Sequence, residues 1–349
     1  MERRTFLKNA GKLAGGVALT TSALAVDAAA IPEQVKVAPG ELPRRKLVRT
    51  GEALSIVGFP GLVLRYYEQK DCNDAMVKAR DMGINYFDVA PAYGKDGECE
   101  IKMGKGMSSI NRDKIFLSGK TKMRDAKGAR MELERSLKRL NTDHLDLYQM
   151  HVLHTPGEVE EAFGPNGCMK VIEKAKKEGK IRRIGFSAHT SLAAMAAMNN
   201  YQFDTVMFPI NFVEHFSFAF GQAVLEKAHS QKVSVLTIKS TSAGAWDDSI
   251  PRAEREYWYK MFEDQSNLEL AVNFALSQPN VVTSIPAANY MDHLEKTVAA
   301  AKVFKPVTEH DLNKLLEMTK SRNSMFLPRQ ARGLASHSQH MHHDYEDMC

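Results

Sequence analysis

Residues 126–151, AKGARMELERSLKRLNTDHLDLYQMH, contain one complete unit of the fold. Apolar side chains recur every three or four positions from Ala126 to Leu140, which is the spacing of an amphipathic helix. After a short turn, Leu145 to Met150 is a run of the kind found in buried strands, and His151 follows it directly. The stretch therefore predicts a helix that leads into a buried β-strand.

The same unit recurs along the chain. Eight short β-rich runs alternate with helical segments, which predicts parallel strands joined by right-handed crossovers. The predicted strands are Leu54 to Phe59, Asn85 to Ala90, Ile115 to Ser118, Leu145 to Met150, Ile181 to Ser187, Thr205 to Ile210, Val233 to Lys239 and Val281 to Ile285. Eight units over roughly 250 residues indicate an α/β fold of the (β/α)8 TIM-barrel type.

An open, doubly wound sheet is the alternative to the closed barrel. Such a sheet carries a phosphate-binding G-x-G-x-x-G after its first strand. Residues 58–63 read GFPGLV at that place, so the fingerprint is missing. The closed barrel is therefore favoured.

The amino-terminal residues have the features of a targeting signal. Residues 1–30 have a basic start, a mildly apolar middle and a small-residue end, which is the plan of an export signal. Residues 3–8, RRTFLK, resemble the twin-arginine motif, which predicts export across the bacterial inner membrane by the twin-arginine translocation machinery. A short amphipathic helix and a retained membrane anchor are the alternatives.

The predicted layout has four parts. They are a signal peptide over 1–30, a polar linker over 31–44, the barrel over 45–320 and a His-rich polar tail over 321–349. Within the barrel, Arg45 to Ser55 predicts a hairpin that leads into the first strand. The net charge of the 349 residues is only +5, which indicates no nucleic-acid partner.

Three groups of residues leave alternatives open. The four cysteines lack metal-binding and C-x-x-C spacing, so we expect buried thiols, although an oxidising compartment would permit disulfides. The tail histidines fit a solvated tail better than a metal site. The long loop from 241 to 265 either stacks on substrate or packs on the barrel through its aromatic side chains. These groups are Cys72, Cys99, Cys168 and Cys349; His337, His340, His342 and His343; and Trp246, Tyr257, Trp258 and Tyr259.

Three neighbouring strand ends carry the candidate chemistry, because the active site of such a barrel lies at the carboxyl ends of its strands. The second strand ends near Asp88 and leads to Tyr93, the third ends near Lys120, and the fourth is followed by His151. An ammonium beside a phenol stabilises the phenolate and lowers the pKa of the phenol. The set suits proton transfer to a carbonyl oxygen, a reaction that also needs a hydride-donating cofactor when it is a reduction.

From about residue 45 to residue 304 the chain resembles the aldo-keto reductase family. Residues 87–94, FDVAPAYG, are similar to the family's F-D-T-A-x-x-Y-G. Residues 97–104, GECEIKMG, are similar to its G-x-S-E-x-x-L-G, with Cys99 in place of serine. Residues 136–151 are similar to its S-L-x-R-L-x-T-D-Y-x-D-L-Y-x-x-H.

The resemblance implies a catalytic tetrad in which the phenol is the general acid/base. Its members are Asp88, Tyr93, Lys120 and His151. Lys122 competes for the lysine role. The family's third strand, an apolar run closed directly by lysine, selects Lys120.

The resemblance also implies a nicotinamide cofactor, NADP(H) or NAD(H), with no metal. The implied cofactor-binding residues are Gly61, Ser187, Asn211, Lys239, Asn289 and Glu295. Ala188 stands where the family has an Asn that holds the carboxamide, and His189 either compensates for it or is a satisfied loop histidine. Tyr290 stands where an Arg often reaches the 2′-phosphate, and Lys296 lies nearby, so the choice between NADPH and NADH stays open.

These features predict an exported oxidoreductase that moves hydride between a nicotinamide cofactor and a small carbonyl or alcohol, with Tyr93 as the acid/base. A periplasmic address favours sugars or sugar-derived carbonyls as substrates. The alternative is an exported barrel that retains nucleotide for binding or sensing and has little or no turnover.

Overall fold

The computed structural model describes residues 30–247, 249–255, 257, 259–286 and 290–326. The predicted signal peptide up to residue 29, Trp258, Asn289 and the tail from residue 327, which includes Cys349, lie outside these residues. Among the residues that are described, every helix is too short or too polar to cross a membrane.

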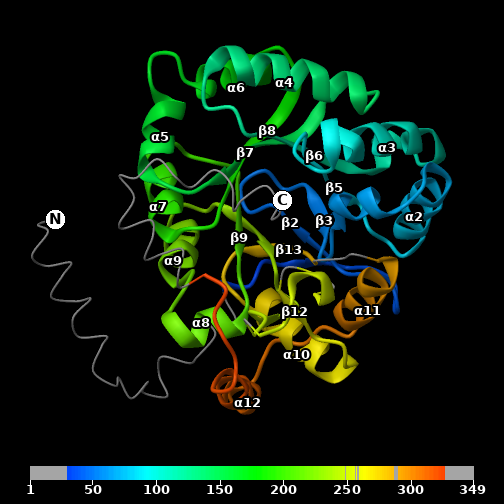
Figure 1. Cartoon of the computed structure of the whole chain (residues 1–349), viewed down its shortest axis with the longest axis vertical. Coiled ribbons are helices and arrows are strands. Elements are labelled where there is room, and N and C mark those ends of the chain that lie inside the picture. Colours follow the sequence, from blue (N-terminus) through cyan, green and yellow to red (C-terminus); the bar gives the residue numbers. More distant parts are fainter. Residues whose placement is uncertain (1–29, 248, 256, 258, 287–289, 327–349) are drawn as a thin grey trace, which may run out of the picture.

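Eight parallel strands form the centre of the molecule (Figure 1). In spatial order they are β13 (Val281–Ile285), β10 (Ser234–Ile238), β9 (Thr205–Pro209), β8 (Ile181–Ala188), β7 (Leu145–Leu153), β6 (Phe116–Thr121), β5 (Tyr86–Asp88) and β4 (Phe59–Pro60). Each strand lies beside its sequence neighbour within the barrel, as right-handed crossovers require.

The sheet closes between its first and last strands. Val57 and Ser284 form a parallel bridge, the Gly58 N–H donates to Ser284 O at 2.9 Å, and the Ser284 N–H donates to Ile56 O at 2.9 Å. A Cβ at Gly58 would lie 2.5 Å from the Tyr86 ring, so only glycine fits this close approach. The predicted closed barrel is confirmed.

Helices surround the barrel on its outer face (Figure 1). They are α2 (Gln69–Asp81), α3 (Glu98–Gly106), α4 (Ala126–Arg139), α5 (Pro156–Phe163), α6 (Cys168–Lys177), α7 (Ser191–Asn200), α8 (Phe212–Phe218), α9 (Gln222–Ser230), α10 (Gln265–Leu276), α11 (Met291–Lys302) and α12 (Glu309–Thr319). Short 3-10 turns are η3 (Gly61–Tyr66), η4 (Lys95–Gly97), η5 (Met107–Ser109), η6 (Arg112–Lys114) and η7 (Arg252–Glu254).

Side chains cap several of these helices at their first turn. Asp125 accepts the Gly128 N–H at the start of α4, and Asn211 accepts the Glu214 N–H at the start of α8. Such caps satisfy backbone donors that have no partner inside the helix. They fix where each helix leaves the loop that follows a strand.

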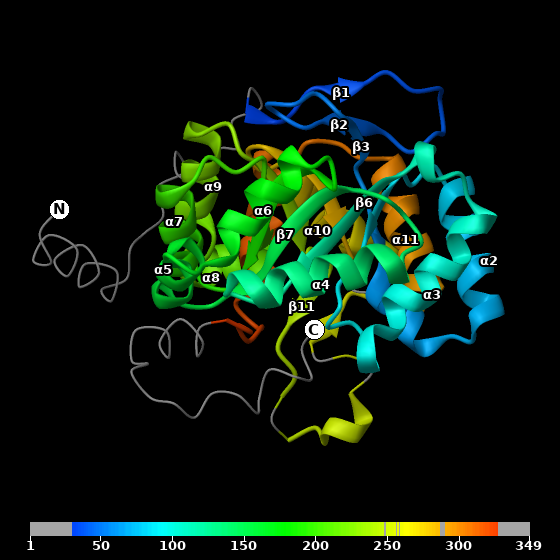
Figure 2. The same cartoon turned by 90° about the horizontal axis from the view of Figure 1, so that it is seen from above.

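A three-stranded antiparallel sheet covers the amino-terminal end of the barrel. Its strands are β1 (Gln34–Val35), β2 (Arg44–Lys46) and β3 (Ala53–Ser55), and Figure 2 shows it opposite the loop that follows β10. The predicted hairpin is present as β2 and β3. The predicted first strand is divided, because its beginning belongs to β3 and its end to β4. β1 lies inside the segment that was expected to be a linker, since two residues are too few to show a strand period.

The apolar core has two parts. The larger part fills the space between strands and helices. The smaller part, around Leu54, Leu147 and Leu236, fills the inside of the barrel. The polar side chains of the carboxyl ends of the strands lie beyond this inner core, which is where the predicted chemistry falls.

The loop after β10 is folded onto the barrel. It contains β11 (Ser242–Gly244) and β12 (Lys260–Met261), which pair antiparallel. The Trp246 indole N–H donates to Tyr257 O at 2.8 Å, and Tyr259 is buried. These contacts support packing, rather than an open stacking wall, as the role of the aromatic side chains.

The described cysteines are buried free thiols. Burial raises the pKa of Cys72 and of Cys168 to about 11, so both stay protonated and unreactive at neutral pH. The described residues contain no group of three or more His, Cys, Asp or Glu arranged to hold a metal ion.

Candidate active site

The structure brings three of the four predicted tetrad side chains into one hydrogen-bonded group. Asp88 ends β5, Lys120 lies in β6, and Tyr93 lies in the loop after β5. The Lys120 ammonium donates to Asp88 Oδ2, and it lies 3.1 Å from Tyr93 Oη. The Tyr93 hydroxyl lies 3.5 Å from Asp88 Oδ2. A phenol, an ammonium and a carboxylate are therefore held in mutual contact.

Burial strengthens the attraction between the charges in this group. Lys120 is 0% exposed and Asp88 is 2% exposed. A buried charge is tolerated only when it is paired and hydrogen-bonded, and attraction between charges increases as water is removed. The ammonium also donates to Val89 O at 3.3 Å. Lys120 is thus held as a fixed cation beside the phenol.

Tyr86 adds a second donor to the same carboxylate, one that the sequence analysis missed. Its hydroxyl donates to Asp88 Oδ1 at 3.1 Å from inside the barrel. Burial, with the nearby Asp88 carboxylate, raises the pKa of Tyr86 well above 10, so the hydroxyl keeps its proton. Tyr86 shares the inward face of β5 with Asp88 at a spacing of two residues, which is the sequence signal that points to it.

His151, the fourth residue of the predicted tetrad, lies in β7. Its ring meets the Tyr93 ring edge-on, with centroids 5.6 Å apart. Burial lowers the pKa of His151 well below 6.5, and the Lys120 ammonium lowers it further. The imidazole is therefore neutral at neutral pH. Its Nδ1 has no hydrogen-bond partner among the residues that the structure describes.

The loop that presents Tyr93 is braced by α3 and α4. The Cys99 N–H donates to Tyr93 O at 3.2 Å. Gly97 has φ of +74°, and a Cβ there would lie 2.1 Å from the Arg139 guanidinium. Arg139 in turn pairs with the buried Glu100 at 3.2 Å. The similarity over residues 97–104 thus reflects the support beneath the tyrosine.

The opposite side of the barrel mouth holds the predicted nicotinamide contacts. Asn211 is 1% exposed; its Oδ1 caps α8, and its Nδ2 has no partner in the described part of the chain. Ser187 Oγ accepts the Val152 N–H at 2.7 Å and keeps its own proton to donate. A buried amide donor and a hydroxyl donor fit a carboxamide ligand.

Lys239 and His189 meet across the same side. The Lys239 ammonium donates to His189 Nε2 at 2.9 Å, because an ammonium has no lone pair and the imidazole nitrogen must accept. Both side chains are buried. His189 is therefore hydrogen-bonded to another of the predicted cofactor residues.

Two of the predicted cofactor-binding residues make contacts within the protein itself. A Cβ at Gly61 would lie 2.3 Å from Asp88 O, so this glycine lets η3 pack against the end of β5. The Glu295 carboxylate pairs with Lys78 on α2 at 2.5 Å. Asn289 lies outside the described residues.

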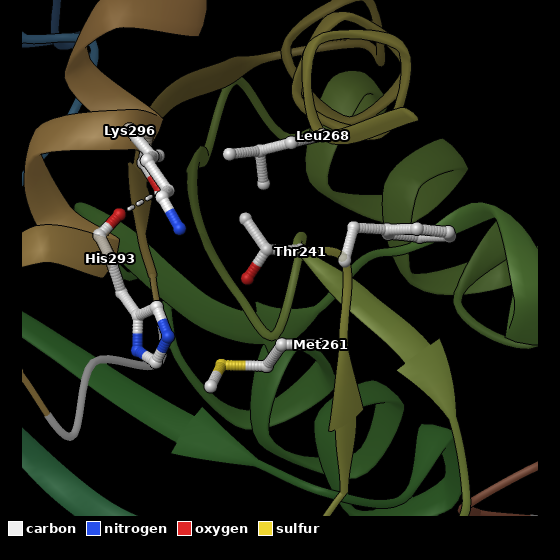
Figure 3. Close-up of a pocket in the computed structure, with 7 residues that line it drawn as sticks. Thr241, Met261, Leu268, His293 and Lys296 are labelled. Atoms are coloured by element: carbon white, nitrogen blue, oxygen red, sulfur yellow. Dashed lines mark hydrogen bonds between the residues drawn. The ribbon is translucent and has the colours of Figure 1, made fainter. Parts of the chain in front are cut away.

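A small cavity lies between the loop after β10 and α11 (Figure 3). Thr241 and Lys296 point toward it from opposite sides, with His293 and Met261 nearby. Thr241 is 3% exposed, yet its Oγ1 has no partner among the described residues, and neither has His293 Nδ1. Its walls are largely apolar, and they carry the Lys296 ammonium and the Thr241 hydroxyl.

Known proteins resemble the chain in sequence and in fold. The model of the Aldo/keto reductase family matches residues 58–319. Aldo-keto reductase YhdN of Bacillus subtilis is 29% identical over 246 residues, 66% of this chain and 67% of that protein. Methylglyoxal reductase YeaE of Escherichia coli is 37% identical over 109 residues, 31% of this chain and 35% of that protein.

Among solved structures, the holo form of aldo-keto reductase AKR11C1 from Bacillus halodurans has the same fold. Its TM-score is 0.64 at 21% identity, over 81% of this chain and 98% of that one.

Proposed function

The chain belongs to the aldo/keto reductase family and is an NAD(P)-dependent oxidoreductase, and from that premise we propose that Tyr93 is its general acid/base. The contact that carries this proposal is the 3.1 Å approach of the Lys120 ammonium to Tyr93 Oη. A fixed cation at that distance favours the phenolate and thus eases loss of the phenolic proton.

The proposed steps follow from the four side chains. A nicotinamide cofactor bound beside these side chains would supply the hydride that a carbonyl reduction needs. Tyr93 Oη gives its proton to the carbonyl oxygen, and the Lys120 ammonium stabilises the phenolate that remains. Asp88 keeps the ammonium in place. In alcohol oxidation the same phenolate takes the proton back.

His151 has the role of orienting the substrate. A neutral imidazole carries one N–H, which can donate to the carbonyl oxygen without competing with Tyr93 as a stronger acid. The edge-on contact of the two rings, with centroids 5.6 Å apart, supports a role for both groups at one substrate oxygen.

The other side of the mouth binds the cofactor in this proposal. Asn211 Nδ2 and the Ser187 hydroxyl would hold the carboxamide, and Lys296 and Thr241 would bind the nucleotide end. Tyr290 offers only a neutral hydroxyl where a guanidinium would bind the 2′-phosphate bidentately. We therefore expect NADPH to be preferred over NADH by less than about a hundredfold, about 2.7 kcal/mol.

The proposed substrates are small aldehydes, ketones and sugar-derived carbonyls. The name of methylglyoxal reductase YeaE supports the small-carbonyl class. The proposed location is the periplasm, supported by residues 3–8, RRTFLK. Replacing both arginines with lysine is expected to hold the full chain in the cytoplasmic fraction, and unchanged export would contradict the twin-arginine route.

Label transfer tests the proposed function. NADPH and NADH, each deuterated at the transferable position, are offered with a panel of aldehydes, 2-oxoaldehydes and keto-sugars. Deuterium on the product carbon of at least one substrate is expected. Tight binding of nucleotide with no transfer to any panel member would contradict the reductase and favour the nucleotide-retaining binding barrel.

A further inference from the structure

Strand β7 contains one extra residue immediately after His151. Along the pairing with β8, Met150 lies opposite Phe186 and Leu153 lies opposite Ala188, so three steps in β7 match two in β8. This is a β-bulge, a feature that redirects the side chains beside it. The bulge begins where the strand presents His151 to the barrel mouth.

Val152 takes the extra position in an unusual conformation. Its φ is +54°, in the left-handed region that a β-branched residue rarely adopts. A strained backbone of this kind persists only where the surrounding structure over-determines it. The groups that hold Val152 therefore also set the direction of His151.

The guanidinium of Arg124 holds the bulge from the neighbouring loop. Its Nη2 donates to His151 O at 2.8 Å and to Val152 O at 3.1 Å. From the other side, Ser187 Oγ accepts the Val152 N–H at 2.7 Å. The two carbonyls and the amide of the bulge are thus all hydrogen-bonded to side chains.

Arg124 is itself held in place. Its Nη2 also reaches Glu158 at 3.2 Å, and the same carboxylate oxygen accepts the His154 N–H at 3.0 Å. The Arg124 side chain is only 11% exposed. A guanidinium offers several donors in a rigid plane, whereas a lysine ammonium is a compact charge on a flexible stem.

We propose that Arg124 is a positioning residue for His151: through the two carbonyls of the bulge it fixes the imidazole in the direction that meets the substrate oxygen. The proposal rests on the proposed function, because it assigns Arg124 a part in the same reaction. A displacement of about 1 Å in a catalytic group can lower a rate about a hundredfold. Loss of the Arg124 hydrogen bonds is therefore expected to lower the reaction rate, although Arg124 touches no reacting atom.

The variant Arg124→Lys tests the proposal because it keeps the charge but carries all its donors on one atom. Arg124 instead uses two nitrogens: Nη1 donates to Lys122 O at 3.2 Å while Nη2 donates to the bulge. Arg130→Lys is the matched control, since Arg130 on α4 pairs with Glu134 of the same helix and with Glu178 at the end of α6. Three readouts are compared: kcat and KM for an active carbonyl, the dissociation constant of the cofactor, and two NMR signals. The signals are the His151 ring resonances and the exchange rate of the Val152 amide.

For Arg124→Lys we expect a fall of 10- to 100-fold in kcat/KM, with cofactor affinity within twofold of wild type. The Val152 amide is expected to exchange at least tenfold faster, and the His151 ring resonances to shift. Arg130→Lys is expected to change none of these. Wild-type values for either NMR signal or for kcat/KM in Arg124→Lys would overturn the proposal.

Failure of the proposed function gives a different pattern. If wild type transfers no hydride, the reductase is refuted, while the NMR signals still decide whether Arg124 directs His151. If Arg124→Lys does not fold, Glu158→Gln replaces it, because Glu158 is partly exposed and the amide removes the charge that pairs with Arg124, while its oxygen can still accept the His154 N–H. A smaller change in the same direction is then expected, and none would overturn the proposal.

Discussion

The two sides of the barrel mouth differ in how their polar groups are satisfied. On the side of β5 and β6, Asp88, Tyr93 and Lys120 bond one another. On the side of β9 to α11, Asn211 Nδ2 and Thr241 Oγ1 are buried donors with no partner among the described residues. The first side is assembled by the protein alone, and the second has groups suited to a ligand. Changes on the first side should therefore alter rate and stability, and changes on the second should alter affinity.

The largest effect is expected from Lys120→Met. Removing one partner leaves the Asp88 carboxylate buried and unpaired, which costs about 3–5 kcal/mol of unfolding free energy. Urea unfolding at pH 7 measures the loss, and turnover should vanish as well. Lys122→Met is the control, since Lys122 is exposed. An equal loss in both variants would show that Lys120 was chosen wrongly.

Low pH is expected to reduce the stability of the fold, because each side of the barrel mouth contains a buried histidine. Burial lowers the pKa of His215 on α8 to about 4 and that of His151 well below 6.5. Because the unfolded chain binds protons near pH 6.5, stability present above pH 6.5 is lost as the pH falls.

The His215 share of this loss is about 3 kcal/mol by pH 4. His215→Phe, which replaces the imidazole with a ring that packs against Phe216 and Phe274, should reduce the loss by that amount. Urea midpoints at pH 7 and pH 4 provide the comparison. The same acid sensitivity in variant and wild type would contradict the assignment to His215.

Asn211→Ser separates the capping of α8 by Asn211 from its proposed contact with the cofactor. Serine keeps the cap of α8 and loses the amide donor. We expect the cofactor dissociation constant to rise about tenfold, about 1.4 kcal/mol, with little change in melting temperature. Fluorescence titration and thermal melts measure the two effects. A lower melting temperature with unchanged affinity would assign Asn211 to structure alone.

The smallest effect is expected from Tyr290→Arg at the nucleotide end. Tyr290 is 52% exposed, and its ring lies 6.4 Å from that of Tyr66. A guanidinium there should strengthen NADPH binding about tenfold or less and leave NADH unchanged, because only NADPH carries the 2′-phosphate. Parallel titrations of both cofactors decide it. No gain for NADPH would place the phosphate site elsewhere.

The sequence predicted the first side better than the second. Asp88, Lys120 and His151 all lie at ends of predicted strands, and a parallel barrel brings such ends together whatever the detail of the loops. The partners of Glu295 and His189 depend on contacts across 50 or more residues, which no local pattern contains.

The bulge in β7 also escaped prediction, for a physical reason. The run from Leu145 to Leu153 contains no glycine to mark a positive φ, and Val152 is among the least expected residues for that conformation. Arg124 was overlooked because its contacts with the bulge are to backbone carbonyls. Such contacts leave no signature in the sequence of either partner.

The most direct test of the central claim compares wild type with Tyr93→Phe in two measurements on the same samples. One is the rate of hydride transfer in a single turnover with an active carbonyl, and the other is cofactor affinity by fluorescence titration. The variant is expected to transfer hydride roughly a thousandfold more slowly, as loss of a general acid implies, while it binds cofactor within twofold of wild type. Full transfer by Tyr93→Phe would contradict the proposed acid.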